Sequence, residues 1–451
     1  MTTGRLKADP SYWEFKGCKA CDMASQAVEA VGSSEAQPNS GFASGVFLLI
    51  HVNKASISPD ANDQTGDLGL GLKNTANDLF VLNANNDPSS RRGLHLASKK
   101  IIEDMTASVD AAFTKNLPKV ELHAHLTGSI TPQCLHEIWT QRKSGDPSMT
   151  LQDPLEAMSK NKVWDIVTFF PLFSKYIYGL CSTPTSIVYS TNAVLRDFKE
   201  DGVVYLELRT TPRSSSSMSK DDYVATVLSC IDNFPHRKVM TTYLILSIDR
   251  RNTPEEAMEV VDLAIQYQSR GVVGVDLCGD PSKGDISIFK EAFHKAKLYG
   301  LKITLHFAEV SASSSLLELN TLLSFRPDRL GHVVHVPDDI KAQIKASKLG
   351  LELCVSCNVQ AKLIEGGVAD HHFMSWIKTG CPVILCTDDV GVFDSTLSNE
   401  YLLVAQAFNL SRDDLIDLCD QAVEAIFGDR HEKQRLCALV KEARENRMPI
   451  N

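Results

Sequence analysis

The pattern of apolar and polar positions becomes regular from residue 119 onward. Short apolar runs alternate there with longer stretches in which apolar residues recur at helical spacing. Apolar runs of this length, bounded by turn residues, are typical of buried strands, and the stretches between them predict amphipathic helices. Eight strand-like runs are found, at 119–126, 203–211, 241–250, 272–280, 302–310, 329–336, 349–358 and 382–389.

The stretches between these runs indicate how the strands are connected. Residues 254–271 and 286–300 have helical spacing, and Gly300 is placed where it can cap the second helix. The gap between the first two strands is the longest and has room for several helices. Eight β/α units predict a (β/α)₈ TIM barrel with a helical insertion after the first strand. A doubly wound open sheet is the alternative, but no Gly-x-Gly-x-x-Gly turn follows the first strand.

Residues 1–112 lack this regular pattern. They are rich in Ser, Asn, Asp and Gly, and only residues 45–52 form a strand-like run. We expect a low-complexity, poorly structured extension, and a barrel domain at 113–451. A short helix within 98–116 is predicted to lead into the first barrel strand.

Composition narrows the possible functions. Apolar residues make up 43% of the chain, and the formal net charge is −10 with a pI of about 5.7. An acidic chain offers no positive field for nucleic acid or for an anionic membrane. The longest apolar run, 42–52, is too short to cross a bilayer. The 12 cysteines are scattered, which predicts reduced thiols and a cytoplasmic protein. Cys18 and Cys21 form a C-x-x-C pair with no second pair to complete a zinc site. We expect the protein to be a monomer.

The first strand-like run carries the first candidate for chemistry. It ends in His123-Ala124-His125 and is followed at once by the turn residues Thr127 and Gly128. Residues two apart in a strand point to the same face, so both imidazoles can bind one metal ion. Two histidines that merely pack or face solvent are the ordinary alternative for so short a motif.

Other strand ends carry matching groups. His306 ends the fifth strand with Glu309 three residues later, His332 lies in the sixth, and Asp388-Asp389 ends the eighth. In a barrel these ends meet at the face that holds the active site. Three imidazoles and one carboxylate suit zinc and leave one position open for water. Each group alone has a structural explanation, but their joint occurrence at strand ends favours a metal site.

These motifs resemble a known family. HAHLTGS, DLCGD, HFAE, RLGH and CTDD resemble, in the same order, the motifs of the adenosine deaminase family, zinc-dependent hydrolases built on a (β/α)₈ barrel. The resemblance covers residues 116–427. The cytidine-deaminase type of zinc site, H-x-E with P-C-x-x-C, is absent.

The resemblance implies a role for each matching residue. One Zn²⁺ per chain would be held by His123, His125, His306 and Asp388. Glu309 would give a proton to purine N1, and His332 would orient the attacking water and help to deprotonate it, although Asp388 is an alternative base. Asp389 would bind the purine and position the attacking oxygen, and Gly279 would offer its backbone N–H to the purine edge.

The residue after the H-x-H motif bears on the substrate. Adenosine-specific members of the family carry Asp at the position of Thr127, and that carboxylate would repel a 5′-phosphate by several kcal/mol at an effective dielectric constant of about 20. The second strand ends in Thr210-Thr211-Pro212-Arg213, which offers two hydroxyls and a guanidinium suited to phosphate. An exposed charge without a ligand is the alternative for Arg213.

Together these features resemble the adenosine deaminase-like branch of the family, whose members act on N6-methyl-AMP. The resemblance implies that N6-methyl-AMP and water give IMP and methylamine. It places in the nucleotide pocket His125, Thr127, Tyr178, Thr210, Thr211, Pro212, Arg213, Asp249, Gly279 and Asp389. Thr127, Tyr178 and Cys357 depart from the usual residues of the branch, which affects fine specificity rather than reaction class.

Three other functions are compatible with parts of this pattern. An adenosine or adenine deaminase would use the same chemistry without the phosphate. A binuclear hydrolase commonly needs a Lys at the end of the fourth strand, where this chain has Cys278-Gly279-Asp280. A non-catalytic purine-binding protein would be marked by loss of a metal ligand or of Glu309, and none is lost.

Overall fold

The computed structural model describes residues 109–158, 171 and 173–445, together with the backbone of three strands nearer the N-terminus. The chain divides into two units, 1–108 and 109–451. In the first unit, an antiparallel sheet has the order β1-β3-β2 and consists of β1 (Val46–His51), β2 (Lys73–Thr75) and β3 (Leu79–Ala84). Strand β1 lies within the predicted run at 45–52, whereas β2 and β3 were not predicted. Cys18, Cys21 and most of the predicted extension lie outside the described residues.

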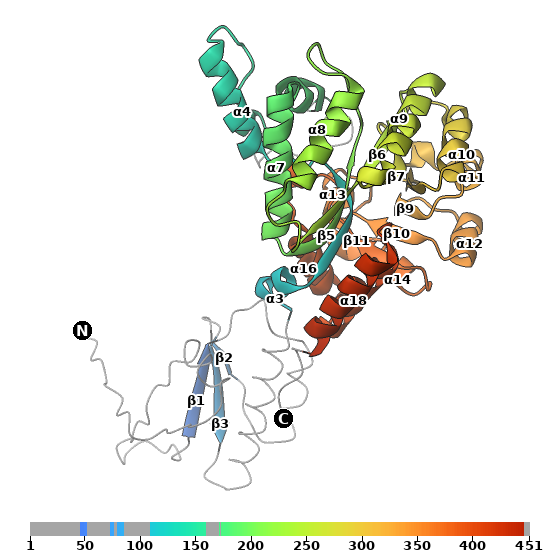
Figure 1. The fold of residues 1–451 in the computed structure, drawn as a ribbon. Coiled ribbons are helices and arrows are strands. Elements are labelled where there is room, and N and C mark those ends of the chain that lie inside the picture. The colour runs from blue at the N-terminus through green and yellow to red at the C-terminus, as the bar shows by residue number, and fades with distance from the viewer. Residues whose placement is uncertain are drawn as a thin grey trace, which may run out of the picture. The chain divides into compact units, whose positions relative to one another are not determined.

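The second unit is a barrel of eight parallel strands, as predicted (Figure 1). Hydrogen bonds join neighbouring strands from β4 to β11 in chain order, and a parallel bridge between Ala124 and Asp388 joins the first strand to the segment after the last. The strands are β4 (Lys119–His125), β5 (Val203–Thr210), β6 (Thr241–Asp249), β7 (Val272–Cys278), β8 (Lys302–Phe307), β9 (Arg329–His332), β10 (Gly350–Leu353) and β11 (Val383–Leu385).

Helices lie around the outside of these strands (Figure 1). The apolar faces of the helices pack on the strands, which are buried on both faces and therefore read as almost continuous apolar runs. Local signals set the helix limits; Thr253 caps α9 with Glu256 at the third position and Pro254 at the first. The main outer helices are α7 (Pro184–Glu200), α8 (Lys220–Asp232), α9 (Pro254–Gln266), α10 (Lys290–Leu298), α11 (Leu316–Ser324), α12 (Asp338–Ser347), α16 (Leu397–Phe408), α17 (Arg412–Glu424) and α18 (Arg430–Glu445).

The predicted insertion after the first strand is present. It contains α4 (Pro132–Gly145), α5 (Pro154–Ala157) and a π-helical segment, η5 (Phe173–Tyr178), before α7 begins. Gly300 follows α10 with φ +80°, which agrees with its predicted capping position. The helix predicted within 98–116 is described only as α3 (Ala111–Asn116).

Several predicted strands were too long, including those at 302–310 and 382–389, which end at Phe307 and Leu385, and two others end in a change of backbone conformation. The run at 329–336 is a strand only as far as His332, because His332 and Val333 both adopt positive φ angles that end the extended backbone. The run at 349–358 leaves the sheet after Leu353 and becomes helix α13 (Val355–Gln360). Both turns place side chains at the carboxyl end of the barrel.

Every cysteine in the described part is a free thiol, and all except Cys437 are buried. The prediction of reduced, buried thiols is confirmed for this part of the chain. Among the described residues, no helix has the length and apolar character needed to cross a membrane.

Candidate active site

The four predicted metal ligands meet where the barrel closes. His123 and His125 end β4, His306 lies near the end of β8, and Asp388 follows β11. The backbone N–H of His125 donates to the carbonyl of Asp388 at 2.9 Å, and that of Asp388 donates to the carbonyl of His123 at 2.8 Å. The first and last strands are therefore fixed to each other at the residues that carry the candidate ligands.

The ligand atoms of these four residues converge on one point. Nε2 of His306 lies 3.2 Å from Nε2 of His123 and 3.1 Å from Nε2 of His125. Oδ1 of Asp388 lies 3.3 Å from each of those two histidine nitrogens. A tetrahedral zinc ion with bonds of 2.0–2.1 Å separates its ligands by about 3.3 Å, so the observed spacing fits zinc. A second group, formed by His123, His332, Cys354 and Asp388, overlaps the first.

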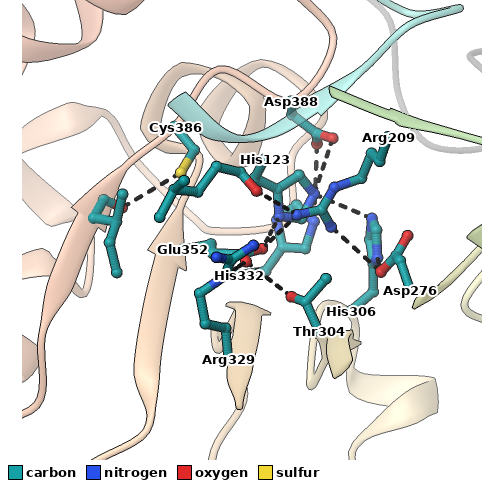
Figure 2. A network of polar contacts seen from close by, with 12 residues as sticks. His123, Arg209, Asp276, Thr304, His306, Arg329, His332, Glu352, Cys386 and Asp388 are labelled. Carbon is teal, nitrogen blue, oxygen red and sulfur yellow. Dashed lines mark hydrogen bonds and ion pairs between the residues drawn. The ribbon is translucent and has the colours of Figure 1, made fainter. Parts of the chain in front are cut away.

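Carboxylates behind the histidines set the orientation of the rings (Figure 2). Nδ1 of His123 lies 2.7 Å from Oε2 of Glu352, and Nδ1 of His306 lies 3.1 Å from Oδ1 of Asp276. A neutral imidazole that donates through Nδ1 has a lone pair on Nε2. These two lone pairs point at the same place, and a metal cation satisfies that arrangement.

A buried arginine joins the two carboxylates. The guanidinium of Arg209 donates to Oε2 of Glu352 at 2.8 Å, to Oδ1 of Asp276 at 3.3 Å and to the carbonyl of Leu122 at 2.6 Å. Figure 2 shows Arg209 beside His123 with Arg329 nearby. Arg329 donates to the other oxygen of Glu352 at 2.6 Å. The base of the site is therefore a buried network of alternating charges.

Sequence reasoning missed this network, although the sequence contained a signal for it. Arg209, Asp276 and Glu352 each lie inside a mostly apolar strand, within VYLELR, VGVDL and LGLEL. A charged residue in such a run is buried and must be paired.

The predicted catalytic groups lie around this metal-binding group. Glu309 lines a cavity at the carboxyl end of the barrel together with His125, His306, Asp388 and Asp389. Nε2 of the buried His332 lies 3.9 Å from Oε1 of Glu309 and 3.8 Å from Oδ2 of Asp388. The structure therefore brings all three predicted catalytic residues to the ligand group.

Asp388 and Asp389 are adjacent but differ in their surroundings. Burial, together with the charges of Asp388 and Glu309, raises the pKa of Asp389 well above its usual range. Burial alone would also raise the pKa of Asp388, but the hydrogen bond and charge of His123 hold it well below the usual range. A Cβ atom at Gly128 would lie 1.4 Å from Oδ1 of Asp389, so only glycine at position 128 leaves room for this carboxylate.

Most of the predicted substrate-binding residues line the same cavity. Gly279 adopts φ +96° beside Asp249, where a Cβ atom would lie 2.7 Å from the carboxylate. Thr210, Pro212 and Arg213 are not among the lining residues. The predicted residues that do line it are His125, Thr127, Tyr178, Thr211, Asp249, Gly279 and Asp389.

Arg213 uses its guanidinium within the protein. It donates to the carbonyl of Cys181 at 2.9 Å, and it lies 4.7 Å from the ring centre of Tyr178 and 4.9 Å from that of Tyr223. The hydroxyls of Thr210 and Tyr223 are 2.7 Å apart. Arg213 is therefore placed to support Tyr178 from behind rather than to face the cavity.

The arginine in the cavity lining is Arg251, which sequence reasoning did not single out. Its Nε donates to Oδ1 of Asp249 at 2.8 Å and its Nη2 to Oδ2 at 2.6 Å, and its side chain is 55% exposed. The sequence LSIDRR carries two adjacent arginines, and the first, Arg250, is directed to Glu318 instead. Only the folded loop shows which of the two faces the cavity.

Comparisons with known proteins agree with this geometry. The profile of the adenosine deaminase family matches residues 118–443. The N6-mAMP deaminase of Arabidopsis thaliana is 36% identical over 346 residues, which are 71% of this chain and 96% of that protein. The N6-methyl-AMP deaminase of Homo sapiens is 34% identical over 336 residues, which are 72% of this chain and 92% of that protein.

Comparison with solved structures also finds similarity to this group of deaminases. Arabidopsis ADAL complexed with IMP is similar, with a TM-score of 0.70 and 35% sequence identity, over 74% of this chain and 99% of that one. The residues matched by the family profile include all eight barrel strands and the ligand group. The chain therefore belongs to the adenosine deaminase family and is a hydrolytic deaminase.

Proposed function

We propose that this enzyme removes methylamine from N6-methyl-AMP by zinc-dependent hydrolysis and releases IMP. The observation that carries the proposal is the group His123, His125, His306 and Asp388, of which all but His123 line the same cavity as Glu309. The names of the relatives support the nucleotide substrate, because the Arabidopsis and human proteins are N6-methyl-AMP deaminases and Arabidopsis ADAL has been solved with IMP.

The four ligands would hold one zinc ion, since three imidazoles and a carboxylate are a donor set that zinc accepts. When bound, the ion lowers the pKa of a water molecule to about 7 and so makes it a nucleophile at neutral pH. Arg209 and the carboxylates of Glu352 and Asp276 hold two of the rings in place.

The remaining residues act on the purine. Glu309 gives a proton to N1 while oxygen adds to C6, and this lets C6 become tetrahedral without placing a negative charge on the ring. Asp389 hydrogen-bonds the purine and positions the attacking oxygen, and Gly279 offers its backbone N–H to the purine edge. The C6–N6 bond then breaks, the amine takes a proton and leaves as methylamine, and the 6-oxo purine remains.

The cavity lining supports an alkylated nucleotide. Phe173, Ala361 and Phe393 supply apolar surface, which the N6-methyl group needs. Thr127 places no charge near a phosphate. Arg251 supplies a guanidinium that a phosphate can reach, and we assign to it the role that the sequence suggested for Arg213.

A side-by-side assay tests this function. The full chain loaded with zinc is given N6-methyl-AMP, AMP and adenosine, and formation of the 6-oxo purine is followed by ultraviolet absorbance. Fast turnover of N6-methyl-AMP is expected, with AMP and adenosine turned over far more slowly. Fast turnover of adenosine would replace the nucleotide assignment by adenosine deaminase activity, and no turnover of any substrate would favour a non-catalytic purine-binding protein.

Replacing Arg251 with Ala is expected to raise KM for the nucleotide by roughly 10- to 100-fold, because a charge-assisted hydrogen bond contributes about 1.5–3 kcal/mol. KM for the corresponding nucleoside should change little. The matched variant Arg213→Ala should affect nucleotide and nucleoside equally, because Arg213 contacts the cavity only through Tyr178. A selective loss of nucleotide affinity in Arg213→Ala alone would return the phosphate role to that residue.

Removal of the metal is expected to abolish turnover and to lower the melting temperature by several degrees, since a bound ion stabilises the folded state by mass action. Dialysis against a chelator, followed by calorimetry and elemental analysis, checks both effects. One equivalent of Zn²⁺ per chain should restore both properties. Full activity in a chain shown to contain no metal would contradict the proposal.

A further inference from the structure

A series of buried polar groups lies behind His332, on the side away from the cavity. Nδ1 of His332 lies 3.0 Å from the amide atom placed as Oδ1 of Asn358. The amide atom placed as Nδ2 lies 3.0 Å from Nε2 of His371. Nδ1 of His371 accepts a hydrogen bond from the backbone N–H of Phe373 at 3.1 Å. The three side chains are buried, so their hydrogen bonds depend on one another.

The hydrogen bond at one end of this series can run in only one direction, from donor to acceptor. A backbone N–H can only donate, so Nδ1 of His371 must be unprotonated. Burial, with smaller contributions from the nearby His372 and His332, lowers the pKa of His371 to about 2, so the ring is neutral. Its single proton therefore lies on Nε2 and points at Asn358.

The rest of the series follows from that proton. The amide atom that faces Nε2–H of His371 must be the oxygen, because two donors cannot bond to each other. The amide is therefore turned over relative to the placed order, and its NH₂ group faces His332. The oxygen and nitrogen of an amide are nearly identical in size, so the hydrogen-bond network determines which is which. The NH₂ group can only donate, so Nδ1 of His332 accepts, and the proton of the neutral His332 ring lies on Nε2.

We propose that Phe373, His371 and Asn358 form a relay that fixes the tautomer of His332, so that this residue presents an N–H to the active site. His371 and Asn358 are then positioning residues for the reaction, because they act through His332 without touching the substrate. The catalytic consequence rests on the proposed deaminase function, whereas the tautomer itself does not.

The surroundings of Nε2 support the same conclusion independently. Nε2 of His332 has no hydrogen-bond partner among the described residues. Two acidic oxygens lie near it, Oε1 of Glu309 at 3.9 Å and Oδ2 of Asp388 at 3.8 Å. The carboxylate of Asp388 would repel a lone pair on Nε2, and it attracts an N–H.

This tautomer gives His332 and Asp388 different roles toward the attacking oxygen. An N–H on Nε2 donates a hydrogen bond to the attacking oxygen and stabilises the negative charge that develops there. The same nitrogen has no lone pair with which to take the proton of that oxygen. Of the two bases considered from the sequence, the relay therefore assigns proton acceptance to the carboxylate of Asp388 and orientation to His332.

Nitrogen NMR measures the tautomer directly. The full chain, loaded with zinc and labelled with ¹⁵N-histidine, gives separate signals for protonated and unprotonated ring nitrogens, and His332→Gln and His371→Gln assign them. Both rings are expected to carry their proton on Nε2. A proton on Nδ1 of His332 would overturn the relay. No substrate is needed, so failure of the relay and failure of the proposed function are distinguishable.

Substitution of Asn358 by Asp tests the consequence for catalysis. A carboxylate accepts hydrogen bonds from both sides, so it should draw the His332 proton to Nδ1. We expect kcat to fall by about 100-fold or more, as when an oxyanion donor is lost, with KM and zinc content little changed. Asn320→Asp, an exposed site on α11, is the matched control and should keep wild-type kcat. An Asn358→Asp variant with wild-type kcat would contradict the proposal.

Two substitutions of His371 separate the relay from simple packing. Gln at this position can accept and donate in the same order as the neutral imidazole, so His371→Gln should keep more activity than His371→Phe. His371→Phe keeps the ring shape but has no donor for Asn358, and it should lose the single His332 tautomer seen by NMR. Equal activity and identical spectra in the two variants would assign His371 to packing alone.

Discussion

Replacing Glu309 with Gln is expected to abolish turnover of the 6-aminopurine while the metal stays bound. Glutamine has nearly the same size and can still hydrogen-bond the purine, but it has no acidic proton for N1. A positioned general acid contributes about 10²- to 10⁴-fold to a rate, so kcat should fall at least that far. Glu309 lies outside the four-residue metal-binding group, so metal content should remain that of the wild type. Steady-state kinetics and elemental analysis on the same preparation check both statements.

A matched control separates this effect from a general loss of charge. Glu259 is 53% exposed on α9, where it pairs with Lys220 at 2.7 Å. Glu259→Gln should keep wild-type kcat and stability. Near wild-type turnover in Glu309→Gln would remove Glu309 as the acid and leave Asp389, whose pKa is raised by burial and by its charged neighbours, as the remaining proton donor in the cavity.

Replacing Arg209 with Met is expected to lower the free energy of unfolding by about 3–5 kcal/mol. The substitution keeps most of the side-chain volume but leaves the buried carboxylates of Glu352 and Asp276 without their shared cation. Metal affinity should fall as well, by about 10- to 100-fold, because these carboxylates orient His123 and His306. Urea denaturation and competition with a chelating dye measure the two quantities.

An exposed ion pair provides the comparison for Arg209. Arg270 pairs with Asp232 at 2.6 Å, and both side chains are more than one third exposed. Such pairs contribute at most about 1 kcal/mol, so Arg270→Met should change neither stability nor metal affinity appreciably. If Arg209→Met were as stable as Arg270→Met and bound metal equally well, the network beneath the site would have no measurable role.

Local sequence was sufficient to predict the barrel and the ligand group. The eight apolar runs correspond to the eight strands because a parallel strand is buried on both faces and leaves a continuous apolar signal. His123 and His125 could be paired from their spacing alone, since strand geometry has a period of two. His306, Glu309, His332 and the two aspartates could be added because parallel strands bring their carboxyl ends to one face of a barrel.

The sequence alone could not show which arginine faces the cavity, because the direction of a side chain depends on the conformation of its loop. Arg213 follows a strand end, as a ligand-binding residue would, yet it packs between two tyrosines contributed by η5 and α8. Arg251 lies in a loop that brings it beside Asp249 and into the cavity. The limits of β9 and β10 were also missed, since positive φ angles at His332 and Val333 and the helix at 355–360 depend on tertiary contacts.

The sequence by itself determined the fold, the four candidate metal ligands and the class of reaction, because each depends on periodicity or on motif order along the chain. Tertiary structure alone decided which distant residues support those ligands. Arg209 joins carboxylates from β7 and β10, and His371 reaches His332 through Asn358 on α13. Such pairings depend on distances between segments far apart in the chain, and a hydrogen bond acts only within about 3 Å, so no local pattern specifies them.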